Sequence, residues 1–270
     1  MVEIISTYTT EEAIEKCRLP APREASSSRE WSDEKAGASY EDAVRMGLDG
    51  DPESALGLNK YLGVLARVRQ HTRAVTRWQE AGSMVDVAAY LAGEPECMME
   101  MVPARRPSPV IRIAIERCVS FFTSAEEMRA TGASALAIVE ALRTAGVPAE
   151  IWVTFTTGWP TRKSVLSEQV LVQEPGRPID LDRLAFWAAN PAAFRRLAFA
   201  LYEQEPSEIR NEFHIYTGGG YGSANSRPPN EDFFDEVAPS DSYSCERWVR
   251  EVLNRRAGIE LLDANFEEVR

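Results

Sequence analysis

A stripe of apolar residues at steps of three and four predicts a long helix in the first third of the chain. The stripe consists of Leu58, Leu62, Leu65, Val68, Thr72 and Val75. This spacing places all six side chains on one face of an α-helix. Asp51 followed by Pro52 is typical of a helix start. We therefore expect one amphipathic helix over residues 51–79.

Strand and helix patterns alternate in the middle of the chain. The predicted elements are a strand at residues 110–115, a helix at 131–145, strands at 148–158 and 163–176, and a helix at 180–205 that breaks near Asn190. Asp180 stands where the last helix needs a cap. The order strand, helix, strand, strand, helix predicts an α/β layer structure.

Composition shifts divide the chain into four predicted parts. They are an N-terminal segment and flexible linker at 1–39, a helical extension at 40–107, an α/β core at 108–210, and a loop-rich region with a C-terminal helix at 211–270. Pro, Ser and charged residues dominate the linker. Trp31 within it is expected to anchor the segment to the core. A short helix is expected over residues 84–93, ended by the Glu-Pro that follows.

Charge and cysteine content narrow the class of protein. Hydrophobic residues make up 44% of the 270 residues, enough for a sizeable core. The net charge of −12 argues against a protein that coats nucleic acid with its whole surface. Four cysteines without a CxxC pair, and two histidines, favour reduced thiols in the cytoplasm and no zinc or other cofactor. The N-terminus does not resemble a signal peptide, and no apolar run is long enough to span a membrane.

Cys97 lies between a Gly-Glu-Pro-Glu turn and the methionines of residues 98–101. A reactive thiol needs a cationic neighbour to hold it as the thiolate, and neither histidine is near it in the sequence. A small apolar residue beside methionines favours core packing instead.

Basic residues on the predicted long helix are the strongest functional lead. Arg69, Arg73 and Arg77 are four apart, so on a helix they form one row. No acidic residue lies between Glu53 and Glu80. The candidate binding residues are Lys60, Arg67, Arg69, Arg73, Arg77, Trp78, Arg105 and Arg106, with Arg195 and Arg196 added if the fold brings them close. They predict either a surface for single-stranded DNA, with Trp78 stacking on a base, or a face that pairs with the protein's own carboxylates.

Two further motifs favour a structural role over a catalytic or phosphate-binding one. The glycine-rich TGGGYGS at residues 217–223 lacks the Lys-Ser/Thr of a phosphate loop and no predicted helix follows it, which favours a turn. His214 beside it has no marked nucleophile to serve as a general base. We therefore predict no catalytic residues.

Two resemblances add context. VDVAAYLAGEPECMMEM, AGVPAEI and PIDLDRLAFWAANPAAFRRLAF resemble an uncharacterised, phage-associated family with a domain of unknown function, over roughly residues 40–205. The element order from residue 110 to 203 resembles a von Willebrand factor A core. That fold often holds a metal through Asp-x-Ser-x-Ser after its first strand, where this chain has Glu116, Arg117 and Ser120, with Ser124 beyond. The resemblance therefore implies a degenerate, metal-free site.

The sequence as a whole favours a non-enzymatic binding or adaptor protein, phage-encoded and acting in the host cytoplasm on a host or phage macromolecule. A protein partner is expected, and a homodimer is an open alternative. The alternative functions are a single-stranded DNA-binding protein and an enzyme of unidentified class.

Overall fold

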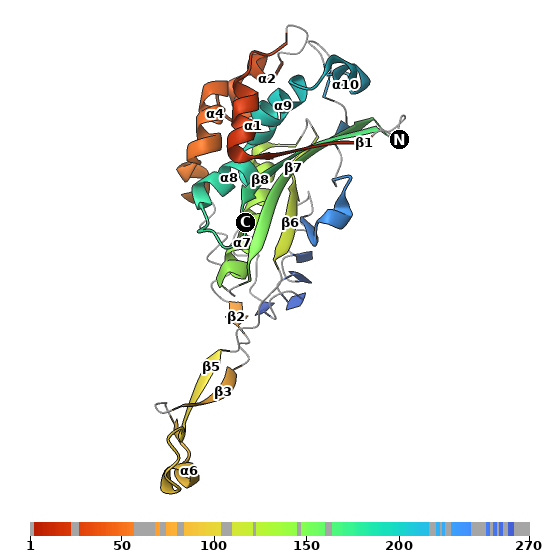
Figure 1. Ribbon diagram of the computed structural model, residues 1–270. Helices are drawn as coiled ribbons and strands as arrows, with labels where there is room; N and C mark the ends of the chain where they lie inside the picture. The colour runs from red at the N-terminus through yellow and green to blue at the C-terminus, as the bar shows by residue number, and fades with distance from the viewer. Residues whose placement is uncertain are drawn as a thin grey trace.

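A computed structural model gives the fold of the protein (Figure 1). The residues that it describes are 3–22, 27–56, 68–70, 74–79, 84–103, 110–120, 123–144, 147–159, 164–215, 220–221, 223–224, 228–238, 247–248, 251–252, 254–255 and 259–261. All structural statements below concern these residues.

The core is a mixed, mostly parallel β-sheet with the strand order β1–β8–β7–β6–β10. Its strands are β1 (Glu3–Thr9), β6 (Ile111–Glu116), β7 (Ala149–Trp159), β8 (Ser164–Gln173) and β10 (Glu236–Ala238), and β9 (Ser223–Ala224) pairs with β7. Strands β10, β6 and β7 are parallel, β8 is antiparallel to β7, and β1 is parallel to β8. The α/β class and the strand order along the chain that the sequence predicts are confirmed.

Helices pack on β7 and β8 and on one another. They are α1 (Thr10–Arg18), α2 (Ser27–Glu30), α3 (Asp33–Ala36), α4 (Tyr40–Asp49), α7 (Ala125–Thr144), α8 (Leu181–Ala189), the π-helical turn η1 (Ala193–Ala198), α9 (Phe199–Glu203) and α10 (Ser207–Glu212), with a 3-10 turn η2 (Glu231–Phe233). Asp180 caps α8 by accepting a hydrogen bond from Arg183 N at 3.0 Å, as predicted. No helix in the described ranges is long and apolar enough to cross a bilayer.

The two faces of the sheet differ in polarity because successive strand residues point to opposite sides. On β7, Phe155 packs against Trp187 of α8 with ring centroids 6.3 Å apart, so its face is the one that the helices cover. Thr154 and Thr156 lie on the other face and are also buried. This second face therefore carries buried polar groups that need hydrogen-bond partners.

The segment from 27 to 39 is packed against the core, in contrast to the flexible linker that its composition indicates. Ser28 is fully buried and donates a hydrogen bond to Glu203 Oε2 at 2.6 Å. Trp31 meets Phe199 edge to face, with ring centroids 5.4 Å apart. The anchoring role expected for Trp31 agrees with this contact.

A β-arm extends away from the sheet (Figure 1). It consists of β3 (Ala74–Gln79), β4 (Met84–Val85), the helix α6 (Val87–Leu91) and β5 (Met98–Pro103), with both β3 and β4 antiparallel to β5. A separate pair joins β2 (Val68–Gln70) to β11 (Ile259–Leu261). The short helix expected within residues 84–93 is confirmed as α6.

The long helix expected over residues 51–79 is wrong for its C-terminal part, while residues 57–67 and 71–73 lie outside the described residues. Residues 52–56 are helical, but 68–70 and 74–79 are strands. The stretch Ala74–Gln79 contains Val, Thr and Trp, which suit a pleated surface, and its pairing with β5 settles the conformation. In this stretch the three- and four-residue spacing of apolar residues therefore did not indicate a helix.

Replacing Gly132 by Ala is expected to destabilise the protein, although this change usually favours a helix. A Cβ at Gly132 would overlap the carbonyl oxygen of Ala188 and lie 2.5 Å from Cα of Ala189, where α7 crosses α8. Backbone must shift to make room, so we expect a loss of about 1–3 kcal/mol. Thermal unfolding of the G132A variant measures it, and an unchanged or higher Tm would contradict the close crossing.

Candidate functional site

The structure does not assemble the predicted row of arginines. Lys60, Arg67, Arg73, Arg105 and Arg106 lie outside the described residues. Arg69 is in β2 and Arg77 is in β3, so the two do not share a helix face. The strand register places Arg69 opposite Glu260 and Arg77 opposite Glu100. Trp78 follows Arg77 in β3, opposite Met99.

Arg195 and Arg196 are buried and hold the N-terminal segment, so they do not extend a basic surface. Arg196 donates to the carbonyl oxygens of Ala38, Ser28 and Trp31 at 3.0, 2.8 and 2.8 Å. Arg195 donates to two further carbonyl oxygens, at 2.6 and 2.7 Å. Both guanidinium groups satisfy backbone acceptors that would otherwise be buried without partners.

Glu116 ends β6 at the position where the von Willebrand resemblance implies a degenerate metal site. Its Oε1 accepts from the backbone N–H groups of Cys118 and Thr156 at 2.8 and 2.9 Å. Its Oε2 accepts from the hydroxyls of Thr154 and Thr156 at 2.9 and 2.6 Å. Complete burial raises the pKa of Glu116 to about 7, although these four hydrogen bonds oppose the shift.

The other residues of this region also have structural partners. Ser124 caps α7: it accepts from Glu127 N at 3.2 Å, while Glu127 Oε2 accepts from Ser124 N at 2.8 Å. The described residues contain no group of three His, Cys, Asp or Glu side chains that could hold a metal ion. The carboxylate of Glu116 thus works as an acceptor for the polar face of the sheet.

Replacing Glu116 by Met is expected to destabilise the fold, because methionine removes the acceptor and leaves the donors buried. The two backbone N–H groups, of Cys118 and Thr156, cannot turn elsewhere. Each buried donor left unsatisfied costs about 1–3 kcal/mol, so we expect the two together to cost about 2–6 kcal/mol. Chemical denaturation measures it. Wild-type stability in this variant would show that the four hydrogen bonds do not support the sheet.

A second buried carboxylate, Glu168 of β8, lies on the helix-covered face and was missed in the sequence. Neither of its oxygens has a hydrogen-bond partner among the described residues. Lys16 of α1 lies nearby and instead donates to Glu205 Oε1 at 2.6 Å and to the hydroxyl of Tyr8 at 2.5 Å. Burial raises the pKa of Glu168 to about 8, with Lys16 lowering it and Glu205 raising it further.

The pKa shifts in this cluster argue against general acid–base chemistry by Tyr8 and Lys16. Burial and Glu168 raise the pKa of Tyr8 to about 12. Burial lowers the pKa of Lys16, but Glu168, Glu205 and Tyr8 outweigh it and raise the pKa above its ordinary value. Both groups therefore keep their protons more firmly than usual, whereas a catalytic base needs a pKa near the working pH.

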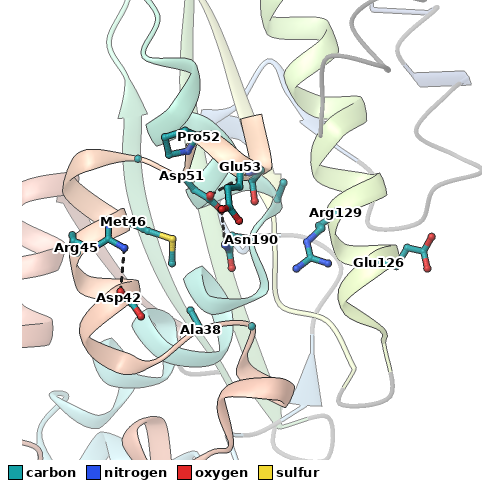
Figure 2. Close-up of a pocket in the computed structure, with 14 residues that line it drawn as sticks. Ala38, Asp42, Arg45, Met46, Asp51, Pro52, Glu53, Glu126, Arg129 and Asn190 are labelled. Carbon is teal, nitrogen blue, oxygen red and sulfur yellow. Dashed lines mark hydrogen bonds and ion pairs between the residues drawn. The ribbon is translucent and has the colours of Figure 1, made fainter. Parts of the chain in front are cut away.

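A cavity of about 890 Å³ opens between α4, the turn at residues 50–54, α7 and the end of α8 (Figure 2). Asp51 on its inner wall accepts from Asn190 Nδ2 at 2.7 Å and from Ser54 N at 3.1 Å. Burial raises the pKa of Asp51, but these hydrogen bonds lower it below its ordinary value. Figure 2 shows Arg129 of α7 pointing toward this wall. The wall itself is a structural network, since Asn190 Oδ1 also accepts from Ala192 N.

The glycine-rich stretch shows packing where it is described. The ring of Tyr221 stacks on that of Phe199 with centroids 3.9 Å apart, and its hydroxyl donates to Glu203. His214 has a backbone φ of 57° just before the stretch. Most of the turn predicted for residues 217–223 lies outside the described residues, so these contacts do not test it.

The tip of the β-arm exposes an apolar surface, here called the arm tip and defined as residues 84–97. Five of the eleven exposed large hydrophobic side chains in the described ranges belong to it: Met84, Val85, Val87, Tyr90 and Leu91. The exposed fraction reaches 64% for Tyr90 and 78% for Leu91. Exposed hydrophobic residues are usually scattered singly over a protein surface, whereas a cluster of them is typical of an interaction surface.

The arm tip is locally ordered by its own hydrogen bonds. Asp86 caps α6, its Oδ1 accepting from Ala88 N and Ala89 N at 2.9 and 3.2 Å. The backbone N–H of Asp86 donates to the carbonyl oxygen of Cys97 at 2.8 Å. Cys97 is buried at the base of the tip, which agrees with the packing role predicted for it. The spacing of Val87, Tyr90 and Leu91 is visible in the sequence, but their exposure is not.

These features define a mixed α/β protein with a projecting β-arm. The model of the family described as Domain of unknown function (DUF7192) matches residues 3–259, and the chain belongs to this family. The match is wider than the resemblance seen over residues 40–205. No curated protein and no solved structure matches the chain.

Proposed function

We propose that this protein is a non-enzymatic binding or adaptor protein that contacts another protein with its arm tip. The observation that carries the proposal is the group of exposed apolar side chains on β4 and α6. Val87, Tyr90 and Leu91 are three and four residues apart, so they form one face of α6. Burying such a face against a partner stabilises a complex by roughly 25 cal/mol per Å² of apolar surface, before the cost of association.

The arm suits this role because of its position. It projects from the core (Figure 1), so a partner can reach the tip without meeting the sheet. Capping by Asp86 and the bond to the carbonyl of Cys97 pre-order the tip. A contact surface that is ordered before binding loses less conformational entropy when the complex forms.

Replacing Tyr90 and Leu91 together by Ser is expected to abolish partner binding while the fold is kept. Both side chains are mostly exposed, so little buried area is lost in the free protein. The measurement is a comparative pull-down from expressing cells, with circular dichroism to check folding. Leu19→Ser is the matched control, because Leu19 is 51% exposed on the core. The proposal is wrong if the double variant retains the same proteins as the wild type and the control.

Two more specific proposals accompany this one, on the fold type and on the biological context. We propose that the core is von Willebrand A-like, supported by the order β6, α7, the antiparallel pair β7 and β8, and α8. We also propose that the protein acts in a phage programme in the host cytoplasm, which rests on the sequence resemblance alone.

Single-stranded DNA binding remains the alternative predicted from the sequence. The backbone register sets an acidic residue opposite each arginine, Glu260 opposite Arg69 and Glu100 opposite Arg77. This register disfavours a row of arginines that binds phosphates. A salt-dependent gel shift with single-stranded DNA tests the alternative. If binding is seen, the logarithm of the binding constant should fall by about 0.7 per phosphate contact for each tenfold rise in salt concentration.

A further inference from the structure

We propose that the partner of the arm tip is a protein with an apolar groove bordered by Lys and Arg side chains. This inference rests on the proposed function and adds the chemistry of the partner. It comes from the charges that surround the apolar face of α6, which the proposed function does not use.

The arm tip belongs to a long stretch of the chain without positive charge. No Lys, Arg or His lies between Arg77 and Arg105. The same stretch carries five carboxylates, Glu80, Asp86, Glu94, Glu96 and Glu100. The tip is therefore strongly acidic as well as apolar.

The described carboxylates lie at both ends of α6. Asp86 caps its start, and Glu94 and Glu96 are exposed just after its end. None of the three forms an ion pair with a described residue. Within a Debye length of about 8–10 Å such charges act on a partner together. A groove that takes Val87, Tyr90 and Leu91 thus meets carboxylates at both of its ends, which Lys and Arg side chains on its rim would complement.

The same charges disfavour the other occupants of an exposed apolar helix. A second copy of the chain would bring two sets of carboxylates together around the apolar contact, and like charges across an interface are unfavourable. An anionic lipid surface or a nucleic acid carries phosphates, which repel an acidic tip. A short amphipathic helix laid into a groove is a common mode of protein recognition, with anchors at the spacing seen here.

The test uses random peptides as probes for the partner's chemistry. A library of short displayed peptides is selected on the full-length protein, and the enriched peptides are then measured by fluorescence anisotropy. The variants are Leu91→Ser, the charge variant Glu94→Gln with Glu96→Gln, and its control Glu34→Gln with Glu208→Gln. The control residues are exposed glutamates on the core.

We expect enriched peptides to combine aromatic or aliphatic residues with Lys or Arg. Leu91→Ser should weaken their binding roughly tenfold or more, as for an interface anchor. The charge variant should weaken it several-fold and reduce the loss of affinity between about 50 and 200 mM salt. The control pair should bind as the wild type does.

Four outcomes would overturn the inference. The enriched peptides could have no excess of Lys or Arg and still fail to bind the Leu91→Ser variant. That result would refute the basic rim and leave the proposed function standing. Peptides that bind Leu91→Ser as well as the wild type would refute both. Sedimentation showing a dimer that Leu91→Ser dissociates, or binding to phosphatidylserine vesicles, would assign the tip to a second copy or to a lipid surface.

Discussion

Replacing Arg196 by Met is expected to release the segment that contains α2 and α3 from the core. The guanidinium of Arg196 donates to three backbone carbonyls of this segment, of Ser28, Trp31 and Ala38, and to Asp33 Oδ1 at 2.8 Å. Methionine keeps the length of the side chain but donates nothing. Because several acceptors lose their partner at once, we expect a loss of about 3–5 kcal/mol.

Thermal unfolding and limited trypsin digestion measure this effect. The side chains of Arg29 and Lys35 are already exposed, but release should free the backbone around them, so cleavage there by trypsin should become faster than in the wild type. Asp33→Asn is the matched control, since it removes only the ion pair between the buried Arg196 and the exposed carboxylate of Asp33 and leaves the three carbonyl acceptors in place, so we expect a smaller loss. Equal cleavage rates in R196M and the wild type would show that other contacts hold the segment.

Replacing Glu168 by Gln is expected to stabilise the protein at pH 8 and to leave it nearly unchanged at pH 4. Burial raises the pKa of Glu168 to about 8, from 4.5 in a free glutamate. The native state therefore keeps the proton while the unfolded chain loses it. The contribution of Glu168 to wild-type stability is fully present below pH 4.5 and is lost as the pH rises to about 8. Glutamine does not ionise, so the variant avoids this loss, which is on the order of 3–5 kcal/mol.

The groups that face Glu168 come from three elements: Tyr8 from β1, Lys16 and Cys17 from α1, and Tyr202, with Glu205 beyond it, from the α9 region. The pKa of Glu116 is also raised, to about 7, so Glu116 makes stability fall with rising pH in both the wild type and the Glu168→Gln variant. The difference between wild type and variant therefore isolates Glu168. Urea denaturation from pH 4 to 9 measures it, with exposed Glu208→Gln as the control. A difference that does not change with pH would show that Glu168 ionises in the native state.

Much of the core could be predicted because its signals are local. The apolar runs that became β6, β7 and β8 are long enough to be recognised without their neighbours. The cap at Asp180 depends on a side chain and backbone only three residues apart. The short helix α6 lies between an aspartate cap and a glycine, which are also local signals.

The arm could not be predicted from its own residues. The stretch Ala74–Gln79 fits a helix stripe and a strand about equally, and only pairing with Met98–Pro103 makes it a strand. A sequence pattern does not contain that pairing, because the partner is about twenty residues away. The arginine row predicted on a helix failed because strand pairing of this kind holds both described members, Arg77 in β3 against β5 and Arg69 in β2 against β11.

The sequence by itself determined the α/β class, the order of the core elements and the local caps, since each follows from propensities and contacts between near neighbours. Only the tertiary structure decided what the charged and apolar side chains do. Arg196 is buried because backbone carbonyls from residues 28–38 surround it. Glu168 holds its proton because helices cover its strand. Leu91 is exposed because the arm carries α6 beyond the reach of the core.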